Sequence, residues 1–230
     1  MGMDWIDDLS HELRAPLANL SARLEAMEDG LWPADSTHLK GCRDDVTRLI
    51  RLVERIEAVA RAESMESPCG SLFRLDHVVA RACSGQDATF QSRGVALFWE
   101  CEPIPVRADE GSLGIVLSEL LVNAAQATSP GGRVTVGAKS CMVGGQPHVE
   151  IRISDTGRGI SPEALPRLFE KFFRVDPSRS TQTGGMGLGL SLCECLIRQH
   201  GGTIHVESRL GEGSDFWIDL PQFRTKETYQ

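Results

Sequence analysis

The stretch SHELRAPLANL, residues 10–20, places a histidine beside a glutamate and puts a proline five residues after the histidine. Apolar residues around it repeat every seven positions, which is the pattern of a helix that packs along one seam. The two series are Ile6–Leu13–Leu20–Met27 and Leu17–Leu24–Leu31. Because Pro16 cannot donate a hydrogen bond to the carbonyl of Glu12, we expect the helix to bend or loosen beside His11.

A second segment carries the same seven-residue repeat. Its members are Leu39, Val46, Val53 and Ala60, joined by Cys42, Leu49 and Ile56. Between the two segments, Gly30, Pro33 and the potential N-cap residues Asp35 and Ser36 predict a helix–helix connection. Two helices bury little apolar surface alone, so the pattern predicts a hairpin that dimerises into a four-helix bundle.

The remainder of the chain has a mixed α and β texture. Alternating apolar residues predict strands over 71–75, 95–101, 133–139, 148–154, 203–208 and 214–220. Helical patterns cover 76–91, 110–127, 162–169 and 187–200. We therefore expect an α+β fold with helices on one sheet face. The expected boundaries are a hairpin over 1–66, a linker over 67–71, a second domain over 72–223 and a tail over 224–230.

Composition excludes several classes of function. A formal net charge of −8 argues against a nucleic-acid groove. None of the four lysines follows a glycine, so there is no Walker-A loop. The seven scattered cysteines fit reduced thiols, and no apolar run is long enough to span a membrane. We expect a cytoplasmic fragment of a longer protein.

One glycine-containing stretch is suited to a nucleotide base. In SDTGRGI, residues 154–160, Asp155 follows a predicted strand and offers an acceptor for an adenine amino group. Gly157 and Gly159 would let the backbone approach a flat base. Taken alone, this pattern is also common in ordinary turns.

A second glycine-rich stretch, GGMGLGL at residues 184–190, stands where a helix begins. Gly185, Gly187 and Gly189 would present bare amides and a positive helix end to phosphates. Within ELLVNAAQAT, residues 119–128, Asn123 is polar in an apolar helical stretch and could bind hydrated Mg²⁺. The alternative for Asn123 is a hydrogen bond to the helix backbone.

These stretches, in this order, closely resemble the catalytic core of bacterial two-component sensor histidine kinases. SHELRAPL is similar to the H box, ELLVNAAQAT to the N box and DTGRGI to the G1 box. LFEKFFRVD, residues 168–176, is similar to the F box, and GGMGLGL to the G2 box. The resemblance runs from about residue 4 to residue 220. It implies a dimerisation and phosphotransfer hairpin followed by an α/β-sandwich ATP-binding domain of the Bergerat type.

The resemblance also implies roles for individual residues. His11 would take the γ-phosphoryl group of ATP with Glu12 as its general base. Asn123 would hold Mg²⁺, with Glu119 as a second candidate ligand. The base and phosphates would lie against the remaining nucleotide-binding residues, which are Asp155, Gly157, Gly159, Arg174, Gly185, Gly187, Leu188 and Gly189. For Arg174, a surface ion pair is an equally good interpretation.

The resemblance further implies partners and a location. The phosphoryl group would pass from a homodimer to an aspartate on a response-regulator receiver domain, with no nucleic acid involved. Membrane attachment would come only through an upstream segment, and the parent protein would lie in the bacterial cytoplasmic membrane. The sequence does not identify the stimulus or the regulator. It also does not decide whether phosphorylation occurs within one chain or across the dimer.

Two rival interpretations compete with the kinase. A gyrase-type or heat-shock-type ATPase uses an N-box glutamate to activate water, and Glu119 stands where that residue would be. Such proteins do not carry the histidine-bearing hairpin. A non-catalytic dimeric scaffold that binds nucleotide and a regulator is the other alternative, and the intact Asn123, Asp155 and glycine loops argue against it.

The residue four positions after His11 predicts weak phosphatase activity toward the regulator. Many members of the family have threonine or asparagine there, and that residue is implicated in positioning water. Ala15 has no side-chain hydrogen-bonding group. We expect slow loss of phosphate when the chain is incubated with its phosphorylated regulator and ADP. Rapid dephosphorylation that tolerates replacement of His11 would contradict this expectation.

Overall fold

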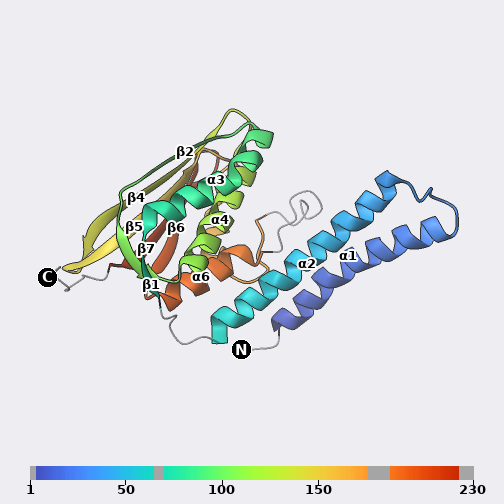
Figure 1. Ribbon diagram of the computed structural model, residues 1–230, viewed down its shortest axis with the longest axis horizontal. Helices are drawn as coiled ribbons and strands as arrows, with labels where there is room; N and C mark the ends of the chain where they lie inside the picture. Colours follow the sequence, from blue (N-terminus) through green and yellow to red (C-terminus); the bar gives the residue numbers. More distant parts are fainter. Residues whose placement is uncertain (1–3, 65–69, 176–186, 223–230) are drawn as a thin grey trace.

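The computed structural model describes residues 4–64, 70–175 and 187–222 of the chain (Figure 1). Helices α1 (Asp4–Glu28) and α2 (Ser36–Ser64) form an antiparallel hairpin that extends to one side of a sheet-containing body. Helix α1 continues unbroken through Pro16, whose side chain is buried. The bend expected at this proline stays a prediction. None of the described helices is both long and apolar enough to cross a membrane.

The turn between the two helices is fixed by local hydrogen bonds. Gly30 has a φ of 72°, and its N–H donates to the carbonyl of Met27 at 3.2 Å. Asp35 caps α2 by accepting from the N–H groups of Thr37 and His38, both at 3.0 Å. These contacts confirm the predicted connection, because an αL glycine ends one helix and an aspartate begins the next.

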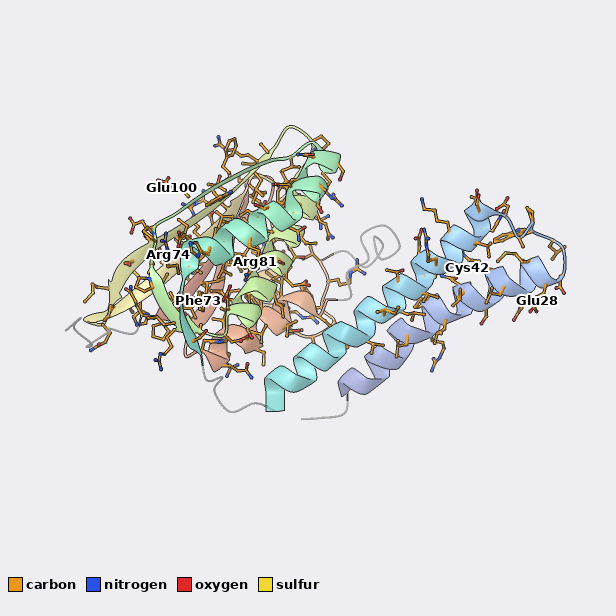
Figure 2. The ribbon with its side chains drawn as sticks, viewed as in Figure 1. Glu28, Cys42, Phe73, Arg74, Arg81 and Glu100 are labelled. Atoms are coloured by element: carbon orange, nitrogen blue, oxygen red, sulfur yellow. The ribbon has the colours of Figure 1, made fainter. Side chains whose placement is uncertain are left out.

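The hairpin leaves many of its described apolar side chains exposed in a single chain. Cys42 is 8% exposed between the helices (Figure 2), whereas Leu17 is 50% exposed and Leu31 is 75% exposed. The other exposed apolar side chains of the hairpin are Leu24, Trp32, Leu39, Val46, Ile50 and Val53. Surface of this kind requires a covering partner. An ion pair, Arg23 Nε to Asp45 Oδ2 at 3.3 Å, joins α1 to α2.

The body is built on a five-stranded mixed sheet of order β2-β4-β5-β7-β6. Its strands are β2 (Ala96–Cys101), β4 (Arg133–Val143), β5 (Gln146–Asp155), β6 (Thr203–Arg209) and β7 (Gly213–Pro221). Only the β2–β4 pair is parallel. Strands β4 and β5 form a hairpin in which Val134 is paired with Asp155, so that the end of β5 lies beside the start of β4.

Helices α3 (Leu75–Arg93), α4 (Glu110–Ala127) and α6 (Gly189–Gln199) lie together on one face of this sheet (Figure 1). Their apolar stripes and the inward sheet residues form one core. Its fully buried members include Phe90, Leu117, Leu120, Leu121, Ile151, Ile153, Leu192 and Ile218. The predicted α+β fold with one helix-covered sheet face is thus confirmed.

One sequence-based prediction of local structure was wrong, and one strand was not predicted. Residues 162–169 contain only a short 3₁₀ turn, η1 (Leu165–Arg167), because Pro166 restricts its predecessor and removes a helical donor. The sequence analysis also missed β3 (Pro105–Ala108), which pairs with β1 (Ser71–Arg74) in a separate two-stranded sheet. A four-residue strand that begins with proline shows too little alternation to be recognised.

Candidate functional site

Helix α4 places a row of polar groups along the edge of the body. It begins after Asp109, whose carboxylate accepts from the N–H of Ser112 at 2.7 Å. Its leucines and Val116 are buried, while Glu119 and Asn123 are half-buried one turn apart. Ala127 follows one further turn along the same line. From Glu119 to Ala127 the helix rises about 12 Å, which is enough to lie along a bound nucleotide.

Asp155 lies at the end of β5 and is only 5% exposed. It is the one buried ionisable carboxylate among the residues that the structure describes. Its Oδ1 accepts a hydrogen bond from the N–H of Gly157 at 2.8 Å. Burial raises the pKa of the Asp155 carboxyl, an effect that the N–H groups of Gly157 and Ser214 partly offset. A charged acceptor is thereby held in a poorly solvated position.

The loop after Asp155 is attached to the end of α4 by backbone contacts. The N–H of Arg158 donates to the carbonyl of Ala127 at 3.1 Å. A Cβ atom at Gly157 would lie 2.6 Å from that same carbonyl oxygen, so a side chain would separate the loop from α4. Gly159 has a φ of 66° and packs against the backbone carbonyl of Arg209. Only glycine satisfies both the conformation and the space at this position.

The start of α6 approaches the other end of the α4 row. Gly189 begins this helix, and a Cβ atom there would collide with the carboxylate of Glu119. The N-cap residue, Leu188, has no side-chain group that could cap the helix. The positive end of the helix dipole at this point favours an anion.

The F-box segment holds the residue before this helix in place. Gly187 has a φ of 70°, and a Cβ atom there would lie 2.6 Å from the carbonyl oxygen of Phe173. The N–H of Phe172 donates to the carbonyl of Gly187 at 2.9 Å. Phe172 itself has a φ of 63°, which is uncommon for a bulky residue and marks a backbone held by its surroundings. The guanidinium of Arg167 lies 4.5 Å from the ring centroid of Phe173.

The structure gathers most of the predicted nucleotide-binding residues around α4. The group is Glu119, Asn123, Asp155, Gly157, Gly159, Gly187, Leu188 and Gly189. The side chain of Leu188 is 3% exposed, so this residue offers only its backbone. Arg174 is half-buried and already engaged in an interaction. Gly185 lies outside the described residues.

The predicted phosphoacceptor histidine lies in the hairpin. His11 and Glu12 are both part of α1, and their side chains lie outside the described part of the structure. The other hairpin histidine, His38, donates from Nδ1 to Asp35 Oδ1 at 2.9 Å and lies beside the ring of Trp32.

Two backbone features of the site were missed by the sequence analysis. The carbonyl of Ala127 holds the loop after Asp155, and nothing in an alanine signals that role. Gly213 has a φ of 106° and packs against the backbone carbonyl of Asp155. A glycine directly before the predicted strand 214–220 suggested a special backbone conformation. Its contact with β5 could not be predicted, because the pairing of the two strands was not known from the sequence.

The residues of the α4 row suit a hydrated magnesium ion. Asn123 and Glu119 supply an amide oxygen and a carboxylate on one helix face, and Mg²⁺ prefers such hard oxygen ligands. Among the described residues, no cluster of three or more histidine, cysteine, aspartate or glutamate side chains could hold a metal. An ion here would therefore share its coordination with water and phosphate oxygens, as Mg²⁺ does in nucleotide sites.

Comparison with known proteins identifies this architecture. The family model described as "Histidine kinase-, DNA gyrase B-, and HSP90-like ATPase" matches residues 108–224. The model "His Kinase A (phospho-acceptor) domain" matches residues 3–64. The chain belongs to the histidine kinases of two-component systems, because both models occur in it in succession.

Individual relatives agree with this classification. The Sensor protein SrrB of Staphylococcus aureus is 32% identical over 230 residues, which is 96% of this chain and 38% of SrrB. The Acinetobacter baumannii histidine kinase AdeS superposes with a TM-score of 0.77 at 25% identity, over 93% of this chain and 98% of that one. Full-length ShkA, solved in complex with AMPPNP, gives a TM-score of 0.68 at 26% identity. The superposition covers 96% of this chain and 46% of the ShkA chain. The chain thus spans under half of the curated relative that it matches.

Replacing Gly159 by alanine tests the backbone approach in the loop. Gly159→Ala is expected to lower the free energy of unfolding by about 2–4 kcal/mol, because the new methyl group meets the carbonyl of Arg209. Gly131→Ala is the matched control, since Gly131 also has a positive φ but has open space around it. The control should cost about 1 kcal/mol in urea unfolding. Equal losses for the two variants would show that the close approach is unimportant.

Replacing Asp155 by asparagine separates binding from stability. Asp155→Asn keeps an acceptor for the N–H of Gly157 but loses the charge, so nucleotide affinity should fall by about tenfold to a hundredfold. Because burial raises the Asp155 pKa, the ionised carboxyl destabilises the folded state. The variant should therefore exceed the wild type in free energy of unfolding at neutral pH, and the difference should vanish as the solution is acidified. Urea unfolding over a pH series measures this, and a difference that grows on acidification would contradict it.

Proposed function

We propose that this chain is an ATP-dependent protein histidine kinase that phosphorylates His11 and then transfers the phosphoryl group to a response-regulator aspartate. The observation that carries the proposal is the arrangement around α4. A buried carboxylate and a glycine loop lie at one end of its polar row, and the start of α6 lies at the other. The site is joined to a hairpin that carries a histidine.

Different residues of the site would bind the adenine, the phosphates and the magnesium ion of Mg-ATP. Asp155 would accept a hydrogen bond from the adenine amino group at the end of β5. The phosphates would lie toward the N–H groups at the start of α6. Gly187 and Gly189 let this helix start pack closely against the F-box backbone and Glu119. Asn123, with Glu119 as a second ligand, would hold magnesium between these ends. The bound ion would neutralise charge that develops on the phosphates.

The proposed reaction forms a bond between a nitrogen of the His11 imidazole and the γ-phosphorus of ATP. The bond from that phosphorus to its bridging oxygen breaks, and ADP leaves with the electron pair. Glu12 would take the proton that the imidazole loses. A receiver aspartate would then attack the phosphohistidine and regenerate the imidazole. Such transfers depend mainly on alignment and charge neutralisation.

The exposed apolar stripe of the hairpin supports a homodimer. Leu17, Leu24 and Leu31 repeat every seven residues and are each at least 45% exposed in the single chain. A second copy of residues 1–66 would cover this stripe and form a four-helix bundle. The nucleotide domain of residues 72–223, joined by the linker 67–71, would then deliver ATP to the bundle. The parent protein would be held in the bacterial cytoplasmic membrane by a segment upstream of this sequence.

The match at the hairpin favours a kinase over the gyrase-type ATPase. The nucleotide-domain model is shared by both classes, so it does not separate them. The phosphoacceptor model over residues 3–64 belongs to the kinases and contains His11. A non-catalytic scaffold is disfavoured because Asn123 and Asp155 are both present.

Autophosphorylation with radiolabelled Mg-ATP tests the proposal directly. The wild type should acquire label that is lost in acid and kept in base, while His11→Ala should acquire none. His38→Gln is the matched control, since it removes the other hairpin histidine and should retain the label. Asn123→Ala should reduce the labelling rate about a hundredfold. Labelling of His11→Ala, or phosphate release without labelled protein, would refute the proposal.

A further inference from the structure

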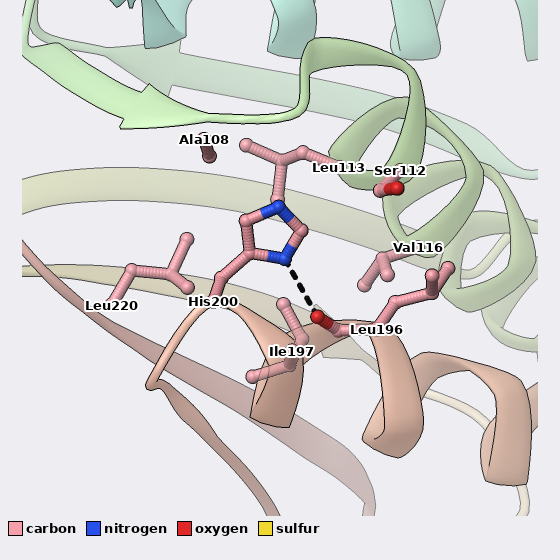
Figure 3. A pocket seen from close by; sticks show the side chains of 8 residues that line it. All are labelled: Ala108, Ser112, Leu113, Val116, Leu196, Ile197, His200 and Leu220. Atoms are coloured by element: carbon pink, nitrogen blue, oxygen red, sulfur yellow. Dashed lines mark hydrogen bonds between the residues drawn. The ribbon is translucent and has the colours of Figure 1, made fainter. Parts of the chain in front are cut away.

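His200 lies at the C-terminal end of α6, where the helix meets the beginning of α4 (Figure 3). Its ring packs among residues from β3, α4, α6 and β7. These neighbours are Ala108, Ser112, Leu113, Val116, Leu196, Ile197 and Leu220. None of them is charged, so the imidazole lies against a largely apolar surface.

Two backbone groups determine the tautomer of this imidazole. The N–H of Asp109 donates to Nε2 at 3.0 Å, and Nδ1 lies 2.7 Å from the carbonyl oxygen of Leu196. A backbone N–H only donates and a carbonyl only accepts. Nε2 must therefore be unprotonated while Nδ1 carries the hydrogen, which is the neutral Nδ1–H form.

A second proton on the ring is incompatible with this arrangement. Protonated Nε2 would point its hydrogen at the N–H of Asp109, and the hydrogen bond would be lost. Among the residues that the structure describes, the Asp109 carboxylate lies close enough to the ring to interact with it electrostatically. Hydrogen bonds from Ser112 hold the pKa of that carboxyl below its usual range.

The hydrogen bond joins α4 and α6 at the end opposite the nucleotide site. The two helices run antiparallel, because Asp109 at the start of α4 meets His200 at the end of α6. Midway along, the thiol of Cys193 donates to the carbonyl of Val116 at 3.8 Å. At the far end, Gly189 packs against the carboxylate of Glu119. The relative position of α4 and α6 along their axes therefore sets the geometry of the site.

We propose that neutral His200 is a positioning residue that holds α4 and α6 in the alignment required for nucleotide binding, and that its protonation weakens that binding. The effect on the nucleotide rests on the proposed ATP site. The hydrogen-bonded state of the ring does not depend on it. The imidazole acts through the two helices and touches none of the proposed ligand-binding residues.

The helix end does not need the imidazole in order to form. The N–H of His200 donates to the carbonyl of Ile197, and that of Gly201 donates to Arg198. The N–H of Gly202 also donates to Ile197, and Gly201 has a φ of 71°. This backbone turn ends α6 independently of the ring. A variant that keeps an acceptor near Nε2, such as His200→Gln, should therefore fold.

The first arm of the test is NMR spectroscopy of the full chain with ¹⁵N-labelled histidine. Comparison with His200→Gln assigns the His200 signals. We expect the Nδ1–H tautomer, and an amide signal of Asp109 that shifts with the protonation of the ring. An Nε2–H tautomer, or an Asp109 amide that ignores this protonation, would overturn the proposal. This arm requires no nucleotide.

The second arm is calorimetric titration with Mg²⁺ and AMPPNP between about pH 8 and about pH 5.5, a range that spans ordinary imidazole titration. The affinity of the wild type should fall by about three- to tenfold more than that of His200→Gln as the pH is lowered. His77→Gln removes an exposed histidine on α3 and should behave as the wild type does. Equal pH dependence in all three proteins would overturn the proposal. Absence of binding at every pH would instead refute the proposed nucleotide site, with the first arm still deciding the state of the ring.

Discussion

The backbone contact between the end of α4 and the loop after Asp155 is the constraint on which the candidate site depends. The carbonyl of Ala127 accepts from Arg158 and lies where any side chain at Gly157 would have to be. This contact places a buried carboxylate beside the helix that carries Asn123. Because it is made by main-chain atoms, its precision does not depend on side-chain rotamers.

The same principle recurs at the other end of α4. Gly189 packs against Glu119, and Gly187 packs against the backbone of Phe172 and Phe173. Glycine is costly to order on folding, so these positions lose conformational entropy in exchange for close approach. The result is a row of nucleotide-sized length, bounded by the Asp155 carboxylate at one end and by the start of α6 at the other. Main-chain groups also hold His200, whose ring is hydrogen-bonded to the N–H of Asp109 and to the carbonyl of Leu196.

Local signals predicted the long elements well. The seven-residue repeats fixed α1 and α2, because a helix of that length displays its period many times over. The apolar stripe of α4 and the alternation of β5 were equally clear, whereas short elements were not. Residues 162–169 were assigned a full helix although Pro166 permits only a 3₁₀ turn, and β3 has four residues. Tertiary pairing, which no local pattern reports, decides such segments.

By itself, the sequence determined the order of the long elements, the hairpin seam, and the residue types of the site, including Asp155, Asn123 and the glycines. These are properties of period and composition, which a linear chain displays directly. Only the tertiary structure decided that the Ala127 carbonyl fixes the loop, that Gly213 packs on Asp155, and that the His200 ring bridges Asp109 and Leu196. Those features depend on contacts between main-chain atoms of residues that are far apart in the sequence. Main-chain atoms are nearly the same in every residue, so the sequence carries no signal for such contacts.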